Sequence, residues 1–499
     1  MKLTIIYPDI LKGASWSGYY YTGIGYLAAV AKKGGHEVSL IHITHPPKQD
    51  HFMRTVAGKI SNDKDALIGF SATTNMFSIV KLLSSWIKAS YKNLIIVGGV
   101  HPTLNPDETI RTEGIDAICV GEGEEPLLEF IDNLQNGKDI TNIPNIWIKD
   151  NGKIHKNPLR PILKDLDTLP FPDREIFNYK NLEHGREGIG IFMASRGCPY
   201  DCYYCCNHAI KRCIGGERGY LRFRSVDNVI REIKQTIQDL PFIKLIHFDD
   251  DILPIRKTWF KDFAVRYSRE VSLPFECNIR PNLINETTVE LLRNAGCKTL
   301  RVGLESGNSF IRNKILNRSL SEETIIKASL LCKEAGIRLY TFNMVGLPFE
   351  DMAARLETIK LNARIDSDEE QVSIFYPYEK TRLYEICKEQ GLLKKREVID
   401  PFRDTSLSFG FIERNQIVFI AYYFALLVRL YKFYFRLSAS LSKIMIKWSD
   451  RFFSGRINAL ILYPLLNFFL GVLIKHKRLE EWTRKIKHTI IRKDRVRRR

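Results

Sequence analysis

The first third of the chain alternates short apolar runs with amphipathic stretches, which is the pattern of a repeated β–α unit. The apolar runs are rich in β-branched and aliphatic residues, as in parallel strands that are buried on both faces. We predict strands at 3–7, 37–43, 66–71, 93–97 and 116–120, and helices at 25–33, 77–89 and 125–136. This order predicts a doubly wound α/β domain, built on a parallel sheet, over residues 1–150.

A second series of the same kind occupies residues 186–385. We predict its strands at 189–194, 245–248, 275–279, 299–304, 339–345 and 371–376. Asn285 can cap a helix that Gly296 ends, and Ser321 can cap a helix that Gly336 ends. Six β–α units are too few for a complete eight-stranded barrel. The pattern therefore predicts a partial (βα)6 TIM-like barrel, with its site at the carboxyl ends of the strands.

The segments outside these two series differ in composition. Residues 151–185 carry four prolines among charged residues, which predicts a linker. Residues 386–499 form a helical, apolar and basic region in which Ile417–Val428 and Ile457–Ile474 are the main apolar stretches. The first is too short to span a bilayer and the second is interrupted by polar residues. Two interpretations remain: helices that lie partly in a membrane interface, or a soluble cap that covers the barrel.

The net charge of +18 changes the picture mainly at the C-terminus. Lys475–Arg499 contains twelve Lys and Arg but only three Asp and Glu. This segment therefore carries half of the chain's net positive charge. A basic tail suggests an anionic partner, either a membrane or a nucleic acid, with a solubility tail as the alternative. The 44% hydrophobic and 26% charged composition excludes a disordered chain and a small disulfide scaffold.

The N-terminus shows no secretory signal, because Met1 and Lys2 lead straight into a short predicted strand. We therefore expect a reducing, cytoplasmic location, in which the ten cysteines would not form disulfides. Under these conditions clustered cysteines point to metal binding or catalysis.

Three cysteines, Cys198, Cys202 and Cys205, follow a predicted strand with the spacing C-x3-C-x2-C. Thiolates at this density select an iron–sulfur cluster or zinc. A structural zinc site takes four ligands, so three cysteines favour a [4Fe–4S] cluster with one iron left open. Cys206 and Cys213 are additional candidate ligands.

This motif, with the aromatic Tyr204 before its last cysteine, resembles the signature of the radical S-adenosylmethionine enzymes. The resemblance implies that the three thiolates hold the cluster and that the open iron binds the amino and carboxylate groups of S-adenosylmethionine. One-electron reduction would then produce a 5′-deoxyadenosyl radical. Tyr204 would pack on the adenine. The family's partial (βα)6 barrel agrees with the six units predicted above.

Other segments at predicted strand ends resemble family elements that surround S-adenosylmethionine or substrate. They are His247–Asp251, Val302–Gly307, Met344–Pro348 and Tyr376–Tyr384. The resemblance implies that Glu305 and Ser306 hold the methionine end or the ribose, and that Asp249 is a further cofactor-binding residue. Arg280 and Asn343 lie at similar strand ends. Helix capping is the alternative role of the acidic run.

The first domain resembles the cobalamin-binding domain of class B members of this family. It carries Gly98–Thr103 after one predicted strand and Gly121–Glu124 after the next. The glycines that the resemblance places at the cofactor are Gly98, Gly99, Gly121 and Gly123. The Asp-x-His-x-x-Gly of other cobalamin modules is absent, so no histidine is marked as the lower cobalt ligand. His101 is interpreted as a locally hydrogen-bonded loop residue. A domain retained without cobalamin is the alternative.

A rival cofactor is suggested by Gly23–Ala28, which formally matches a dinucleotide-binding fingerprint. The fingerprint should directly follow the first strand, yet Gly23 lies sixteen residues after Tyr7. The second predicted strand also ends without an acidic residue. We therefore interpret this match as helix packing rather than as NAD binding.

The leading functional hypothesis is a cobalamin-dependent radical S-adenosylmethionine methyltransferase that acts on an unactivated carbon. The same cofactors could instead support oxidative cyclisation or rearrangement of a tetrapyrrole- or lipid-like substrate. An RNA-modifying enzyme is a further alternative, but the methylthiotransferases use three N-terminal cysteines and residues 1–190 contain only Cys119. A non-catalytic zinc-binding module is the last alternative.

The expected partners follow from this hypothesis. They are a small-molecule, lipid-like or tetrapyrrole-like substrate and an electron donor such as flavodoxin or ferredoxin. Nucleic acid is not expected, because the basic tail has few aromatic residues on which bases could stack. The expected location is cytoplasmic, with peripheral contact to the inner face of the membrane through the C-terminal region.

Overall fold

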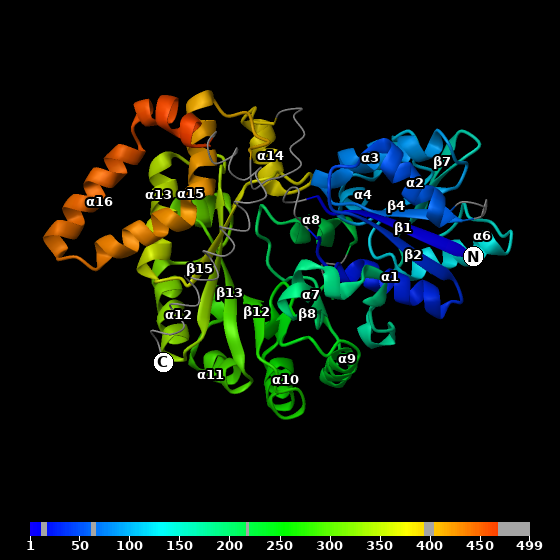
Figure 1. Ribbon diagram of the computed structural model, residues 1–499, viewed down its shortest axis with the longest axis horizontal. Helices are drawn as coiled ribbons and strands as arrows, with labels where there is room; N and C mark the ends of the chain where they lie inside the picture. The colour runs from blue at the N-terminus through cyan, green and yellow to red at the C-terminus, as the bar shows by residue number, and fades with distance from the viewer. Residues whose placement is uncertain (11–16, 61–65, 216–218, 394–403, 468–499) are drawn as a thin grey trace.

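Two separate sheets organise the chain, and a helical extension follows the second. The computed structural model describes residues 1–10, 17–60, 66–215, 219–393 and 404–467. The domain of the first sheet and the barrel of the second lie side by side, and the C-terminal helices project from the far side of the barrel (Figure 1). This architecture confirms the predicted fold class.

The first sheet has seven strands in the order β2-β1-β3-β4-β5-β6-β7. Its strands are β1 Lys2–Pro8, β2 Glu37–Ile43, β3 Leu67–Ser71, β4 Ile95–Gly98, β5 Ala117–Cys119, β6 Ile146–Asp150 and β7 Lys153–Lys156. The pairs among β1 to β5 are parallel. Helices cover both faces, and their bounds are α1 Thr22–Lys33, α2 Gln49–Ile60, α3 Phe77–Lys88, α4 Val100–Leu104, α5 Pro106–Arg111 and α6 Glu124–Gln135. The strand order reverses between β1 and β3, where ligands of such sheets bind.

Five elements of this domain were not predicted: strands β6 and β7 and helices α2, α4 and α5. Asn151 and Gly152 both have positive φ and join β6 to β7 in a hairpin, which extends the first sheet into the predicted linker. Helix α2 was not predicted, because its buried face is a single stripe of Phe52, Val56 and Ile60 among polar residues.

The second sheet has six strands in the order β15-β14-β13-β12-β11-β8, all paired in parallel. Its strands are β8 Ile189–Phe192, β11 Leu245–Phe248, β12 Phe275–Ile279, β13 Cys297–Glu305, β14 Arg338–Val345 and β15 Glu369–Ile374. The helices outside it are α9 Val226–Asp239, α10 Lys257–Glu270, α11 Glu286–Asn294, α12 Glu322–Glu334, α13 Met352–Arg364 and α14 Arg382–Glu389. Asn285 and Ser321 cap their helices as predicted. The partial barrel is thus confirmed.

Each edge of this open barrel is covered by another part of the chain. At β8, the Tyr179 hydroxyl donates to Ile189 O at 3.0 Å and accepts from Ile191 N at 2.9 Å. At the other edge, helix α15 (Phe411–Phe435) packs against β15 and α13. These contacts satisfy or shield edge groups that could otherwise pair with another chain.

The C-terminal region begins with α15 and continues with α16 (Ala439–Phe453) and a short π-helical turn at Asn458–Leu462. The predicted apolar run 417–428 lies inside the longer α15. Within the part of the chain that the structure describes, α15 is the one helix long and apolar enough to cross a membrane, but 44% of its most apolar window is buried. This observation does not show a membrane association. The basic tail lies outside the described residues.

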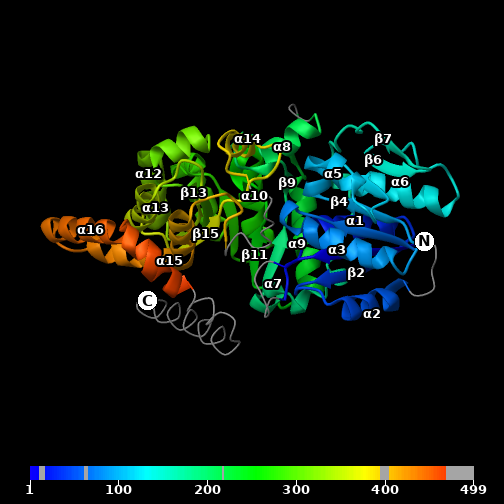
Figure 2. The ribbon, with the colours of Figure 1, turned by 90° about the horizontal axis from the view of Figure 1, so that it is seen from above.

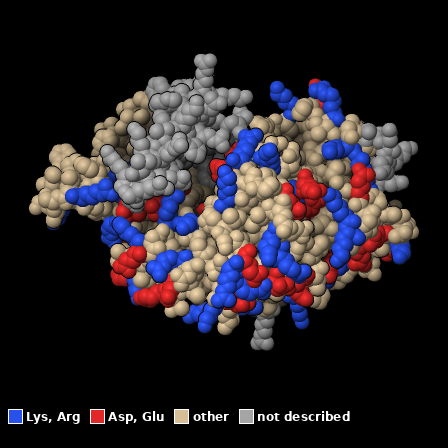
Figure 3. Space-filling view, turned by 60° about the horizontal axis from the view of Figure 1, so that its bottom comes forward, with Lys and Arg blue, Asp and Glu red and all other residues tan. Residues whose placement is uncertain are grey.

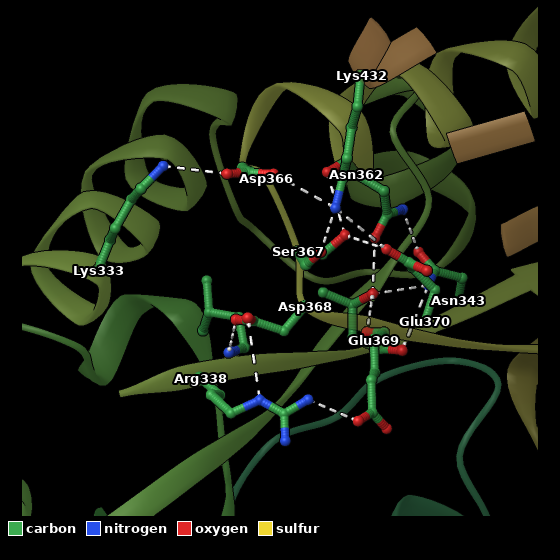
Figure 4. A network of polar contacts seen from close by, with 12 residues as sticks. Lys333, Arg338, Asn343, Asn362, Asp366, Ser367, Asp368, Glu369, Glu370 and Lys432 are labelled. Atoms are coloured by element: carbon green, nitrogen blue, oxygen red, sulfur yellow. Dashed lines mark hydrogen bonds and ion pairs between the residues drawn. The ribbon is translucent and has the colours of Figure 1, made fainter. Parts of the chain in front are cut away.

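Lys432 fastens α15 to the turn that precedes β15 (Figure 4). Its Nζ donates to the backbone oxygen of Ser367 and lies 3.5 Å from Asp366 Oδ1 and 3.7 Å from Glu370 Oε1. Lys333 of α12 reaches Asp366 from the other side at 3.1 Å. The helix is therefore held by ionic contacts as well as by its apolar face.

A buried triad joins the interdomain segment to the barrel. Glu232 of α9 is 1% exposed and lies 2.7 Å from Arg174 Nη2, and it also binds Arg224 Nη1. Arg174 donates to the backbone oxygen of Ile191 in β8. Two guanidinium groups thus share one carboxylate away from water.

We predict that Glu232→Gln lowers the free energy of unfolding by about 3–5 kcal/mol, because two buried guanidinium groups would lose their counter-charge. Chemical denaturation of the anaerobic protein measures this loss. Asp239→Asn removes an exposed charge from the same helix, and we expect it to change the unfolding free energy by less than about 0.5 kcal/mol. Equal effects of the two variants would contradict the assignment.

Candidate functional site

The three motif cysteines lie in one loop that leaves a short strand, β9 (Ser195–Arg196), and enters helix α8 (Cys206–Cys213). Gly197 begins the loop with φ +88°, and a Cβ there would lie 2.5 Å from the backbone oxygen of Tyr220. Only glycine fits this turn. Cys202 is buried, and Cys198 and Cys205 are partly exposed.

Two buried arginines surround this loop. Arg280 follows β12 and its Nη1 donates to Cys202 Sγ at 3.3 Å. Arg318 lies beside Tyr204 and Glu305, and both arginines are at most 6% exposed. The Nε atoms of both lack a hydrogen-bond partner among the described residues. The two positive charges face one buried carboxylate, so the pocket has an excess of positive charge.

This donor set fits an anionic iron–sulfur cluster. Burial raises the pKa of Cys198 to about 12, so its thiolate needs a compensating cation such as iron. The guanidinium groups of Arg280 and Arg318 would balance the negative charge of three thiolates and their sulfides. No group of three metal-binding side chains closes around a single ion in the described residues. A four-iron cluster holds its ligands farther apart than one ion does.

Tyr204 is fixed next to the cysteines by the end of strand β13. Its hydroxyl donates to Glu305 Oε1 at 3.0 Å and accepts from Arg318 Nη1 at 2.6 Å. Glu305 has φ +68° and stands at an irregularity in the β13–β14 pairing. A non-glycine residue in this conformation is strained, which is typical of functional sites. Burial raises the pKa of Glu305, and Arg318 acts against this shift.

Other predicted residues do not join this group. Ser306 is fully buried, and its hydroxyl accepts from Asn308 N at 3.3 Å. The side-chain amide of Asn343 lies inside the barrel wall, where it donates hydrogen bonds to Thr341 Oγ1 and Gln371 O. Asp249 is exposed and lies 3.6 Å from His247.

The acidic run after β11 has mainly a structural role. Asp250 is fully buried and accepts from Ala194 N at 3.0 Å and from the Ser195 hydroxyl. It therefore holds the strand that leads into the cysteine loop. Burial raises the pKa of Asp250 to about 6, and the hydrogen bond from Ser195 acts against this shift.

A polar belt crosses the interior of the barrel, and of its residues only His247 stood in a motif that the sequence analysis singled out. His247 Nδ1 lies 2.8 Å from Glu276 Oε1, and Arg301 Nη1 lies 3.1 Å from His247 Nε2. Arg301 also stacks over Tyr340, which donates to Gln371 at 2.9 Å. Alternating polar positions in consecutive predicted strands are the signal that could have identified this inward face.

A cavity of about 360 Å³ separates the strand ends of the two sheets. The loops after β1 and β3 line one side, through residues that include Asp9 and Asn75. The barrel lines the other side, through residues that include Tyr204, Met344 and Tyr378. No histidine is among its described lining residues. The cavity has the size of a small-ligand site and lies at the strand-order reversal of the first sheet.

The predicted cobalamin-binding glycines Gly98, Gly99, Gly121 and Gly123 do not line this cavity. Gly99 has φ +106°, and a Cβ there would lie 2.8 Å from Ala72 O. Gly121 has φ +88° and donates to Thr103 Oγ1. Gly98 and Gly123 do not have a positive φ, and a Cβ at these positions would lie 3.8 Å and 3.3 Å from the nearest atom. Their contact with cobalamin stays a prediction. His101 lies in helix α4 rather than in the predicted loop. It is buried, its ring centroid is 3.8 Å from that of Phe77, and its Nδ1 lies 3.4 Å from the amide nitrogen of Asn105, a local contact as predicted.

The loop after β5 instead forms an ionic latch with the barrel, which we call the Glu122–Arg222 latch. Glu122 lies 2.6 Å from Arg222 Nη2, and Glu124 lies 2.5 Å from Arg196 Nη2. Arg196 directly precedes the cysteine loop, and Arg222 stands on its partner strand β10 (Arg222–Phe223). Burial by itself would raise the pKa of Glu122. The ionic contacts with Arg222 and Arg196 outweigh this effect and hold the pKa below its ordinary value. The latch fixes the first domain against the cysteine loop.

Comparisons with known proteins agree with this geometry. Residues 193–361 match the family model of the Radical SAM superfamily, and residues 18–131 match that of the B12 binding domain. An uncharacterized methyltransferase of Pyrococcus horikoshii is 28% identical over 387 residues, which cover 76% of this chain and 82% of that protein. The anaerobic magnesium-protoporphyrin IX monomethyl ester cyclase of Synechocystis is 25% identical over 375 residues, which cover 72% of this chain and 71% of that protein.

A solved structure shows the same fold. It is the radical S-adenosylmethionine methyltransferase TsrM of Kitasatospora setae with cobalamin and a [4Fe–4S] cluster bound. It superposes with a TM-score of 0.63 at 16% identity, over 79% of this chain and 76% of that chain. The two domain matches confirm the cofactor set predicted for the family: a [4Fe–4S] cluster, S-adenosylmethionine and cobalamin. The chain is thus a radical S-adenosylmethionine enzyme of the class that carries an N-terminal cobalamin-binding domain.

Proposed function

We propose that the protein transfers a methyl group to an unactivated carbon of a small molecule. The observation that carries this proposal is the shared cavity, because Tyr204 of the cysteine loop and the strand ends of the cobalamin-binding domain face the same space. When bound, the cluster with S-adenosylmethionine supplies hydrogen-atom abstraction, and cobalamin supplies the methyl group. Both must reach one substrate carbon, which a common cavity allows.

The residues of the chain bind and balance these groups. Cys198, Cys202 and Cys205 would hold the cluster, and Arg280 and Arg318 would offset its charge. Tyr204 and Glu305 would hold S-adenosylmethionine beside it.

A second candidate function uses the same cofactors without methyl transfer. The similarity to a magnesium-protoporphyrin ester cyclase favours it, because that relative is named for ring formation on a tetrapyrrole. We propose a tetrapyrrole-like or lipid-like substrate in either case. A low-potential donor such as flavodoxin or ferredoxin would supply the electron. No described feature favours RNA or a non-catalytic zinc module.

The two functions are separated by the mass of the product. Anaerobic protein, reconstituted with hydroxocobalamin and iron, is incubated with S-adenosylmethionine deuterated in its methyl group and with tetrapyrrole or lipid extracts. Methyl transfer adds a fully deuterated methyl group to one component, whereas cyclisation removes hydrogen and adds no label. Failure to take up cobalamin would contradict both functions.

We predict that Cys202→Ala loses most of the reconstituted iron and abolishes 5′-deoxyadenosine formation, because two thiolates do not hold the cluster. Cys206→Ala, at the first residue of helix α8 next to the loop, is the matched control, and we expect it to keep iron, sulfide and deoxyadenosine formation. Iron and sulfide analysis with product chromatography measures both. Iron loss in both variants, or zinc in place of iron, would exclude the three-cysteine assignment.

We predict that Glu305→Gln weakens S-adenosylmethionine binding by roughly 10- to 100-fold, because a charge-assisted hydrogen bond contributes about 1.5–3 kcal/mol. Equilibrium binding to the reconstituted protein measures the affinity. Ser306→Ala provides the comparison, since the Ser306 hydroxyl bonds within its own turn. We expect it to change the affinity by less than about threefold. A larger loss of affinity in Ser306→Ala than in Glu305→Gln would show that Ser306, rather than Glu305, holds S-adenosylmethionine.

We predict that Glu122→Gln impairs methyl transfer but leaves 5′-deoxyadenosine formation intact. The Glu122–Arg222 latch positions the first domain, so its loss should lower methylated product by about tenfold or more while 5′-deoxyadenosine still forms. The ratio of the two products measures the coupling. Glu125→Gln, at an exposed glutamate of the same region, should leave this ratio unchanged. A parallel fall in both products would argue against a positioning role.

A further inference from the structure

The outer face of helix α16 carries large apolar side chains in solvent. Trp448 is 73% exposed, Ile444 53%, Phe452 51% and Leu441 45%. These positions follow the i, i+3, i+7, i+11 spacing that places side chains on one face of a helix. A continuous apolar stripe of this kind marks a surface that contacts something apolar.

This stripe, which we call the α16 stripe, has no role in holding the fold together. The opposite side of α16 packs inward through Ile446 and Phe453, which belong to the apolar cluster around α15. Helix α16 projects away from the barrel in two perpendicular views (Figures 1 and 2). The stripe therefore faces solvent rather than another described element.

Basic residues border the α16 stripe. Lys443, Lys447 and Arg451 are exposed and follow one another at i, i+4 spacing along one flank of it. Residues 429–467 contain seven Lys and Arg but one acidic residue, Asp450. That carboxylate is engaged by Lys360 at 2.9 Å and by the Tyr431 hydroxyl at 2.5 Å. The projecting lobe in Figure 3 is accordingly largely uncharged with Lys and Arg at its margin.

We propose that the α16 stripe inserts into the interface of an anionic lipid bilayer and holds the enzyme on the membrane surface. An apolar face that carries Trp, Phe and Leu beside a Lys- and Arg-rich flank is the composition of an interfacial helix. Anionic headgroups would attract this flank. This inference goes beyond the proposed methyl transfer.

The structure favours a surface contact over two other arrangements. Helix α15 does not span the bilayer, because Lys432 and the pair Arg355–Glu413, at 3.3 Å, tie it to the barrel. A second copy of the chain would bring two basic flanks together without acidic partners, which costs electrostatic energy. A membrane with anionic lipids supplies both the apolar interior and the negative charge.

The experiment measures co-sedimentation of the full-length anaerobic protein with vesicles. We expect binding to mixed phosphatidylcholine–phosphatidylglycerol vesicles, weaker binding to phosphatidylcholine alone, and a loss of binding as salt rises. The double variant Ile444→Ser with Trp448→Ser should weaken binding by roughly 10- to 100-fold. Lys443→Gln with Lys447→Gln should weaken it by about 10- to 30-fold.

The controls separate this proposal from its rivals. Leu330→Ser removes an exposed leucine, 53% accessible, from α12 and should leave binding unchanged. Unchanged binding in both double variants would overturn the proposal. Light scattering that shows a dimer in the parent chain and a monomer in the Ile444 and Trp448 variant would overturn it in favour of self-association. Iron content and 5′-deoxyadenosine formation should be the same in all variants, so a failure here is distinct from a failure of the proposed chemistry.

Discussion

Parallel pairing fixes the direction of strands β1 to β5 in the first domain and of all six barrel strands, and the rest of the structure depends on this constraint. In a parallel sheet all strands end at one edge, so the loops that can carry ligands gather there. The chain builds two such edges and turns them toward one cavity. The cysteine loop after β9 and the loops after β1 and β3 then meet, although long stretches of sequence separate them.

Charge balance explains why this meeting place suits an anionic ligand. Arg280 and Arg318 are buried beside three thiols, with Glu305 as their nearby carboxylate. Burial disfavours the charged form of a thiol and also penalises an unpaired guanidinium. An anionic cluster resolves both costs at once, because it turns the thiols into bound thiolates and gives the arginines a counter-charge. The latch residues are already paired and need no such partner.

Much of this arrangement could be predicted from the sequence, because its signals are local. The β–α periodicity identified the strands of the barrel, and the capping residues Asn285 and Ser321 marked helix starts correctly. The cysteine motif is a short-range pattern as well. The hairpin at Asn151 and Gly152 was missed although its turn signal is present, because the prolines nearby suggested a linker. Other features depend on residues far apart in the chain. Arg318 and Tyr204 are 114 positions apart, and no motif links them.

The two protected edges of the half-barrel have a consequence for how this enzyme can be divided. Tyr179 completes the hydrogen bonding of β8 from before the barrel begins, and α15 shields β15 from after it ends. The segment that matches the superfamily, residues 193–361, contains neither of these covers nor the edge strands β8 and β15 themselves. Excised alone, it would present β11 and β14 as bare strand edges able to recruit neighbouring molecules into an aggregate. The matched segment is thus an incomplete structural unit, because the strands and covers that close its sheet come from the flanking sequences.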